Sequence, residues 1–140
     1  MRILKVLGVL FCTVFFLNPV FATDSDVIVT EAWTRASNSK TSASYMFITN
    51  NQNKDVILTS ATSDIASIVE LHKTVTENNI SQMVHIDRLV IPAHNKVVLA
   101  PKGLHIMLIG LTKPLTKGEI VPITLHFENL NPIIVNTIVK

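Results

Sequence analysis

From residue 27 onward, short runs rich in β-branched and other apolar residues alternate with clusters of turn-forming residues, and no stretch has apolar residues at helical spacing. This pattern predicts an all-β domain of about nine strands, and the strand spacing favours a two-sheet Greek-key sandwich. The segment Ser37–Ser42 is the most polar, and we expect it to be a mobile loop. The predicted strands are Val27–Trp33, Ser44–Thr49, Val56–Thr59, Ser67–His72, Met83–Ile91, Lys96–Leu99, His105–Ile109, Ile120–Phe127 and Ile133–Val139.

The first 22 residues differ from the rest of the chain. Two basic residues precede an almost uninterrupted apolar run from Val6 to Phe16, and Ala22 closes a small-residue cleavage pattern. We therefore predict a signal peptide over residues 1–22 and an exported β-sandwich domain over residues 23–140. An uncleaved membrane anchor is the alternative, but the apolar run is shorter than the ~20 residues that a spanning helix needs. We expect no stable membrane insertion after cleavage.

Composition and charge narrow the function classes. A length of 140 residues with 48% hydrophobic and 16% charged residues fits one globular domain. Removing the signal peptide removes the only cysteine, Cys12, and leaves ten basic and ten acidic residues. Disulfides and thiolate chemistry are then excluded, and the balanced charge gives no indication of nucleic-acid binding. No nucleophile elbow, phosphate-binding glycine loop or His-Glu-x-x-His motif is present, so we expect no enzyme.

The methionines and histidines point to a metal site. One residue separates His105 from Met107, so both side chains lie on the same face of their predicted strand. His72 and Met83 flank a predicted hairpin that brings them close. Two imidazoles and two thioethers offer no hard oxygen ligand, a set that suits Cu(I); zinc rarely accepts thioethers, and Cu(II) is a weaker second candidate. We predict that these four residues bind copper.

The register of the predicted hairpin has two alternatives. A turn centred between residues 77 and 78 places His72 directly opposite Met83. A tighter turn centred between Asn78 and Asn79 places His72 opposite His85 and makes Met83 a diagonal neighbour. Both registers keep the imidazole of His72 and the thioether of Met83 within reach of each other.

The spacing His72-x10-Met83-x21-His105-x-Met107 resembles the signature of the PCu(A)C family of periplasmic copper chaperones. Lys73 stands where many members have a second methionine, and the chain ends without the tail rich in Met and His that carries an extra Cu(II) site in some members. Further similar segments cover essentially the whole predicted domain. These segments are Glu31–Ala36, Ser44–Tyr45, Ile48–Asn50, Val69–His72, Ile91–Ala93 and Gly103–Leu111.

The resemblance implies a fold and a function. The fold would be a cupredoxin-like β-sandwich that binds one Cu(I) through His72, Met83, His105 and Met107. The metal would pass in the periplasm to the dinuclear copper centre of a cytochrome c oxidase subunit, beside a thiol-containing copper assembly protein. We expect a monomer.

Two other functions compete with that of a copper carrier. An electron-transfer cupredoxin needs a cysteine ligand that the predicted domain lacks, whereas a metal-free exported β-sandwich for binding or assembly remains the alternative. His85 is a candidate fifth ligand, although a solvated strand histidine is more common. We expect His94 and His126 to be structural or at the surface. We assign Met46 to the core, and we expect Trp33 and Arg35 to belong to the scaffold.

Overall fold

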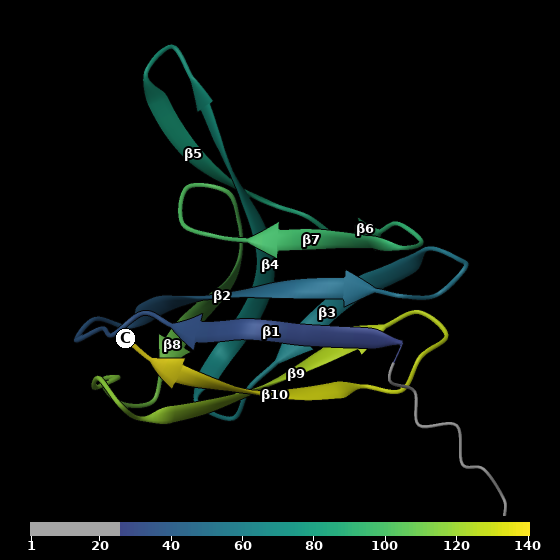
Figure 1. Cartoon of the computed structure of the whole chain (residues 1–140). Helices are drawn as coiled ribbons and strands as arrows, with labels where there is room; N and C mark the ends of the chain where they lie inside the picture. The colour runs from purple at the N-terminus through teal and green to yellow at the C-terminus, as the bar shows by residue number, and fades with distance from the viewer. Residues whose placement is uncertain (1–25) are drawn as a thin grey trace, which may run out of the picture.

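A computed structural model describes residues 26–140, and the signal peptide predicted over residues 1–22 lies outside them. The described residues form ten strands and no helix, which confirms the all-β prediction (Figure 1). No segment of residues 26–140 is a helix long and apolar enough to cross a membrane. The strands are β1 (Val27–Thr34), β2 (Thr41–Asn50), β3 (Val56–Thr62), β4 (Ala66–Glu77), β5 (Ile80–His85), β6 (Leu89–Ile91), β7 (Asn95–Leu99), β8 (Leu104–Leu111), β9 (Ile120–Phe127) and β10 (Ile133–Val139).

Hydrogen bonds join the strands in the order β5-β4-β8-β2-β1-β10-β9-β3-β6. The long strand β2 pairs with β8 over its first half and with β7 over its second half. Only the pairing of β1 with β10 is parallel among the described strands. The sheet folds over so that β3 lies beside β4, and it closes around one core as a β-sandwich. The β4–β5 hairpin projects from this body (Figure 1).

Two predicted segments differ from the structure. The predicted strand Met83–Ile91 is divided into β5, which pairs with β4, and β6, which pairs with β3. The break falls at residues 86–88, where Asp87 and Arg88 interrupt the apolar residues, and Asp is disfavoured in strands. The predicted loop Ser37–Ser42 is shorter than expected: residues 38–40 lie outside the strands, but β2 begins at Thr41, and the backbone of Ser37 exchanges hydrogen bonds of 3.0 and 2.8 Å with Leu115.

Alternation along β4 and β8 separates the core from a second, outer face. Leu71, Ile106 and Leu108 are buried in the core with Met46, as predicted for Met46. Burial of each such side chain contributes about 1.5–3 kcal/mol to stability. Because successive strand residues point to opposite faces, His105 and its neighbours at odd positions of β8 are directed to the outer face. The side chains on this outer face are therefore not needed to fill the core.

A β-bulge in β1 directs an aromatic side chain to the same outer face. The register between β1 and β2 shifts by one residue between Thr30 and Trp33, and Glu31 within the shift has a φ of 53°. The extra residue places Trp33 opposite Tyr45 rather than opposite Ser44, which faces the interior. The ring centroids of Trp33 and Tyr45 are 4.6 Å apart.

Candidate metal site

The β4–β5 hairpin turns through Asn78 and Asn79, which have φ values of 50° and 63°. Two successive positive φ values in a two-residue loop are typical of a type I′ turn, which asparagine tolerates well. In the resulting register, His72 lies opposite His85, and Met83 lies opposite Thr74. The second of the two predicted registers is therefore confirmed, with Met83 as the diagonal neighbour of His72.

The pairing of β4 with β8 brings the remaining predicted residues to the same face. His72 lies directly opposite His105, with 5.7 Å between the ring centroids, and Glu70 lies opposite Met107. Residues directly opposite each other in a ladder project from the same side of the sheet. The outer face of β5, β4 and β8 therefore carries all four predicted ligands, which come from three strands.

Each of the two imidazoles has one nitrogen in a hydrogen bond and one without a partner. The Nδ1–H of His105 donates to the carbonyl oxygen of Gly103 at 3.0 Å, and the Nε2–H of His72 donates to Glu70 Oε2 at 2.8 Å. His105 Nε2 and His72 Nδ1 are buried and have no hydrogen-bond partner among the described residues. A buried unpaired acceptor costs about 1–3 kcal/mol. A hydrogen bond that fixes the tautomer and leaves the other nitrogen bare is typical of metal-ligating histidines.

The two methionines lie at an open groove of about 830 Å³, which His105 also lines. Met83 is 59% exposed on the projecting hairpin, and Met107 is partly buried. A methionine that fills a core is buried, as Met46 is, so the exposed thioether of Met83 has no packing role that would account for it. The groove gives both sulfur atoms access from solvent.

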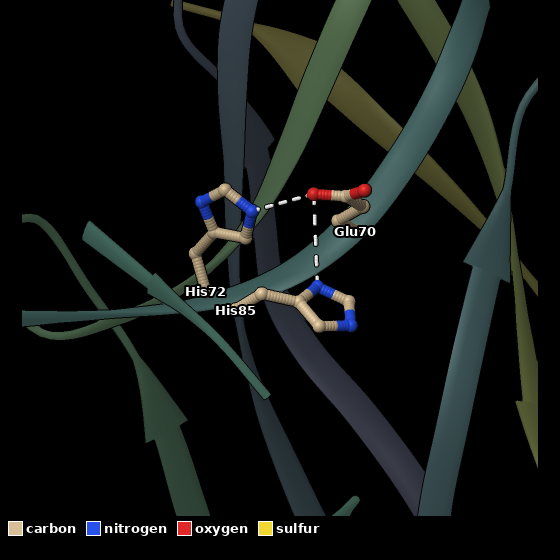
Figure 2. A group of neighbouring side chains, drawn as sticks. All are labelled: Glu70, His72 and His85. Atoms are coloured by element: carbon tan, nitrogen blue, oxygen red, sulfur yellow. Dashed lines mark hydrogen bonds and ion pairs between the residues drawn. The ribbon is translucent and has the colours of Figure 1, made fainter. Parts of the chain in front are cut away.

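Glu70 is a neighbour that the sequence analysis missed. Figure 2 shows Glu70, His72 and His85 directed toward one another from β4 and β5. Glu70 Oε2 lies 2.8 Å from His72 Nε2 and 3.6 Å from His85 Nδ1. The available signal was its spacing: Glu70 precedes His72 by two residues, which places both side chains on the same face of a strand. The predicted ligand set contains no oxygen donor, but a carboxylate lies beside it.

Other residues considered in the sequence lie away from this cluster or only border it. Lys73 is on the opposite face of β4 from His72, so its ammonium group does not face the predicted ligands. His94 lies in the β6–β7 turn against Asn53, and His126 accepts or donates a hydrogen bond with Thr62. Both positions agree with the expected structural or surface role.

Trp33 and Arg35 border the site through Tyr45. The Tyr45 ring lies 4.6 Å from the Trp33 ring, 6.4 Å from the His105 ring and 5.7 Å from the Arg35 guanidinium carbon. These two scaffold residues are therefore one side chain away from a predicted ligand.

The family profile described as "Putative lipoprotein LpqE-like" matches residues 27–139. "Putative lipoprotein Lxx21020" of Leifsonia xyli subsp. xyli is 38% identical over 104 residues, which are 74% of this chain and 63% of that protein. "Uncharacterized protein RP573" of Rickettsia prowazekii is 31% identical over 96 residues, which are 68% of this chain and 53% of that protein. The matches thus span between about half and two thirds of the length of these relatives.

Solved structures share the architecture. The "Copper-bound PCuAC domain from PmoF2" superposes with a TM-score of 0.70 at 21% identity, covering 82% of this chain and 92% of that one. Apo-DR1885 from Deinococcus radiodurans superposes with a TM-score of 0.65 at 27% identity, covering 100% of this chain and 95% of that one. CuI-DR1885 from the same organism superposes with a TM-score of 0.64 at 30% identity, covering 85% of this chain and 83% of that one. The cupredoxin-like sandwich is confirmed, and the chain belongs to the LpqE-like family, with the fold of the PCuAC domains.

Proposed function

We propose that this chain is an exported copper chaperone that binds one Cu(I) through His72 Nδ1, His105 Nε2 and the sulfur atoms of Met83 and Met107. The observation that carries the proposal is the pair of buried ring nitrogens that have no partner in the described part of the chain. They lie on adjacent strands and on the face that holds both methionines. The copper-bound PCuAC domain and the Cu(I) form of DR1885 support the choice of metal.

The ligand chemistry favours the monovalent ion. Thioethers are soft, neutral ligands that suit Cu(I), and the two imidazoles add no charge. The hydrogen bonds to Glu70 and to the Gly103 carbonyl orient each ring and direct its other nitrogen away from these acceptors, where a metal can bind it. Cu(II) prefers imidazole with oxygen ligands, so the methionines would be poor partners for it.

The exposure of the sulfur ligands suits release. Met83 projects from a hairpin into an open groove, so an acceptor ligand can replace its thioether without opening the core. Two basic side chains, Arg35 and Lys102, line this groove, and no carboxylate from residues 26–140 lines it. They favour an acceptor whose docking surface is acidic.

The place of action follows from the resemblance to PCu(A)C proteins. We propose cleavage after Ala22, a monomeric domain over residues 23–140 in the periplasm, and delivery to the dinuclear copper centre of a cytochrome c oxidase subunit, beside a thiol-containing assembly protein. The lipoprotein name of the Leifsonia relative supports export of the chain. The chain acts as a carrier and carries out no catalysis.

An anaerobic Cu(I) titration against a chromogenic chelator tests the proposal. The protein without its signal peptide should bind one equivalent, and His105→Ala should weaken binding at least about tenfold, or 1.4 kcal/mol. His126→Ala removes a histidine that contacts Thr62 on another strand pair and should leave the affinity unchanged. Equal binding by all three proteins would show that copper binds elsewhere and would contradict the proposed site, and no binding by any of them would favour the metal-free exported module.

A further inference from the structure

We infer that Glu70, His72 and His85 form a second cation position, which binds a borderline divalent ion such as Zn(II) beside the Cu(I) ligands. One ligand atom from each residue lies within 4.8 Å of the other two. The atoms are Glu70 Oε2, His72 Nε2 and His85 Nδ1. Two imidazoles and a carboxylate with an open fourth position are a ligand set that zinc accepts, and Cu(II) also suits it.

The two separations that involve Glu70 require only small changes to hold an ion. Ligand atoms about 2.0–2.1 Å from a tetrahedral zinc lie about 3.4 Å from one another. The separation of 3.6 Å between Glu70 Oε2 and His85 Nδ1 is already close to this value. The 2.8 Å contact between Glu70 and His72 is a hydrogen bond, and it must open slightly when a metal replaces the shared proton.

A further carboxylate positions the ring of His85. The Nε2–H of His85 donates to Asp87 Oδ1 at 3.0 Å, which leaves Nδ1 as the bare nitrogen facing Glu70. A carboxylate that holds the far nitrogen of a ligating histidine is a recurring feature of zinc sites. The side chains of His85 and Glu70 are 50% and 35% exposed, so solvent can supply the fourth ligand.

His72 belongs to both positions, and its chemistry makes the two ions compete. A neutral imidazole has one nitrogen that carries a proton and one whose lone pair can bind a metal. When Cu(I) binds Nδ1, the proton must therefore be on Nε2, which donates it to Glu70. A divalent ion on Nε2 requires that proton to move, by exchange with water, to Nδ1. Each ion should therefore lower the affinity for the other by the same factor. This competition rests on the proposed Cu(I) site, whereas the second cation position does not.

Zn(II) titrations against a chromogenic chelator test the position on four proteins without the signal peptide: the wild type, His85→Ala, the double variant Met83→Ala/Met107→Ala, and His94→Ala. The wild type should bind one equivalent, and His85→Ala should weaken binding at least about tenfold. The methionine variant and His94→Ala, which removes an exposed turn histidine, should stay within about threefold of the wild type. Equal zinc affinity in the wild type and His85→Ala would overturn the inference, and so would a failure of the wild type to bind.

Anaerobic Cu(I) titrations of the same proteins separate the two proposals. His85→Ala should keep its Cu(I) affinity, which also shows that the variant is folded, while the methionine variant should lose Cu(I) affinity and keep zinc. Saturating Zn(II) should weaken Cu(I) binding in the wild type but not in His85→Ala. An equal effect of zinc on both proteins would refute competition through His72. A wild type that binds Zn(II) but no Cu(I) would refute the copper proposal and leave the zinc position intact.

Discussion

His72 and His105 lie directly opposite each other on β4 and β8, with 5.7 Å between ring centroids, and each has one buried nitrogen without a hydrogen-bond partner within residues 26–140. An ion that binds both nitrogens would offset the cost of leaving these two acceptors unpaired. Cu(I) binding to the folded chain should therefore raise its melting temperature. At a free Cu(I) concentration of 100 times Kd the stabilisation should be about 2.7 kcal/mol.

Thermal unfolding with buffered Cu(I) checks this prediction. His105→Ala is the matched comparison, because it removes one of the two nitrogens and should abolish most of the shift. Stabilisation of equal size in both proteins would show that copper binds elsewhere on the chain.

Replacing Glu70 by glutamine should lower the Cu(I) affinity about tenfold, the lower end of the range for partners that orient metal ligands. The amide keeps the shape of the side chain but loses the charged acceptor that receives the Nε2–H of His72 at 2.8 Å. Chelator competition measures the change. Glu77→Gln, an exposed change at the end of the same strand, should have no effect, and an unchanged affinity in Glu70→Gln would remove its positioning role.

The turn of the β4–β5 hairpin should control the position of Met83. Asn79 has a φ of 63°, which glycine adopts freely and valine does not. Asn79→Val should destabilise the chain by about 1–3 kcal/mol and weaken Cu(I) binding, because strain in the turn disturbs the register. Asn79→Gly should preserve both properties. Urea unfolding and Cu(I) titration check the pair, and equal behaviour of the two variants would contradict the I′ turn.

Trp33 should report copper binding by a loss of fluorescence. It is the only tryptophan, and its ring lies 4.6 Å from that of Tyr45, which in turn lies 6.4 Å from the ring of His105. Emission should fall in proportion to added Cu(I) until one equivalent is bound, and the response should be absent in His105→Ala. Quenching that continues without saturation would indicate a collisional effect unrelated to the site.

Strand alternation alone placed His105 and Met107 on one face, and turn-forming residues located the β4–β5 hairpin. Propensity could not choose between the two hairpin registers, because residues 76–79 are all acceptable in turns. The actual register depends on positive φ at both Asn78 and Asn79, a property of the folded backbone. Likewise, the charged residues Asp87 and Arg88 mark a break within Met83–Ile91, but they do not show that the chain leaves β4 there and joins β3.

The pairing of His72 with His105 joins strands that are distant in the sequence, so local pattern could not predict it. Strand alternation and the hairpin indicated the two His–Met pairs, and the family resemblance supplied the spacing that relates one pair to the other. Glu70 was overlooked because isolated carboxylates are common on solvated strands; its role became visible when β5 brought His85 to its other side. The proximity of Trp33 depends on a one-residue bulge at Glu31, which strand periodicity does not show.

The most direct test of the copper-carrier account is the anaerobic Cu(I) affinity of the double variant Met83→Ala/Met107→Ala, measured by chelator competition on residues 23–140. Met46→Leu is the control, because it removes a buried core methionine of similar volume far from solvent. The account predicts one tight equivalent in the wild type and in the control, and a loss of at least about tenfold, or 1.4 kcal/mol, in the double variant. Equal Cu(I) affinity in all three proteins would contradict it.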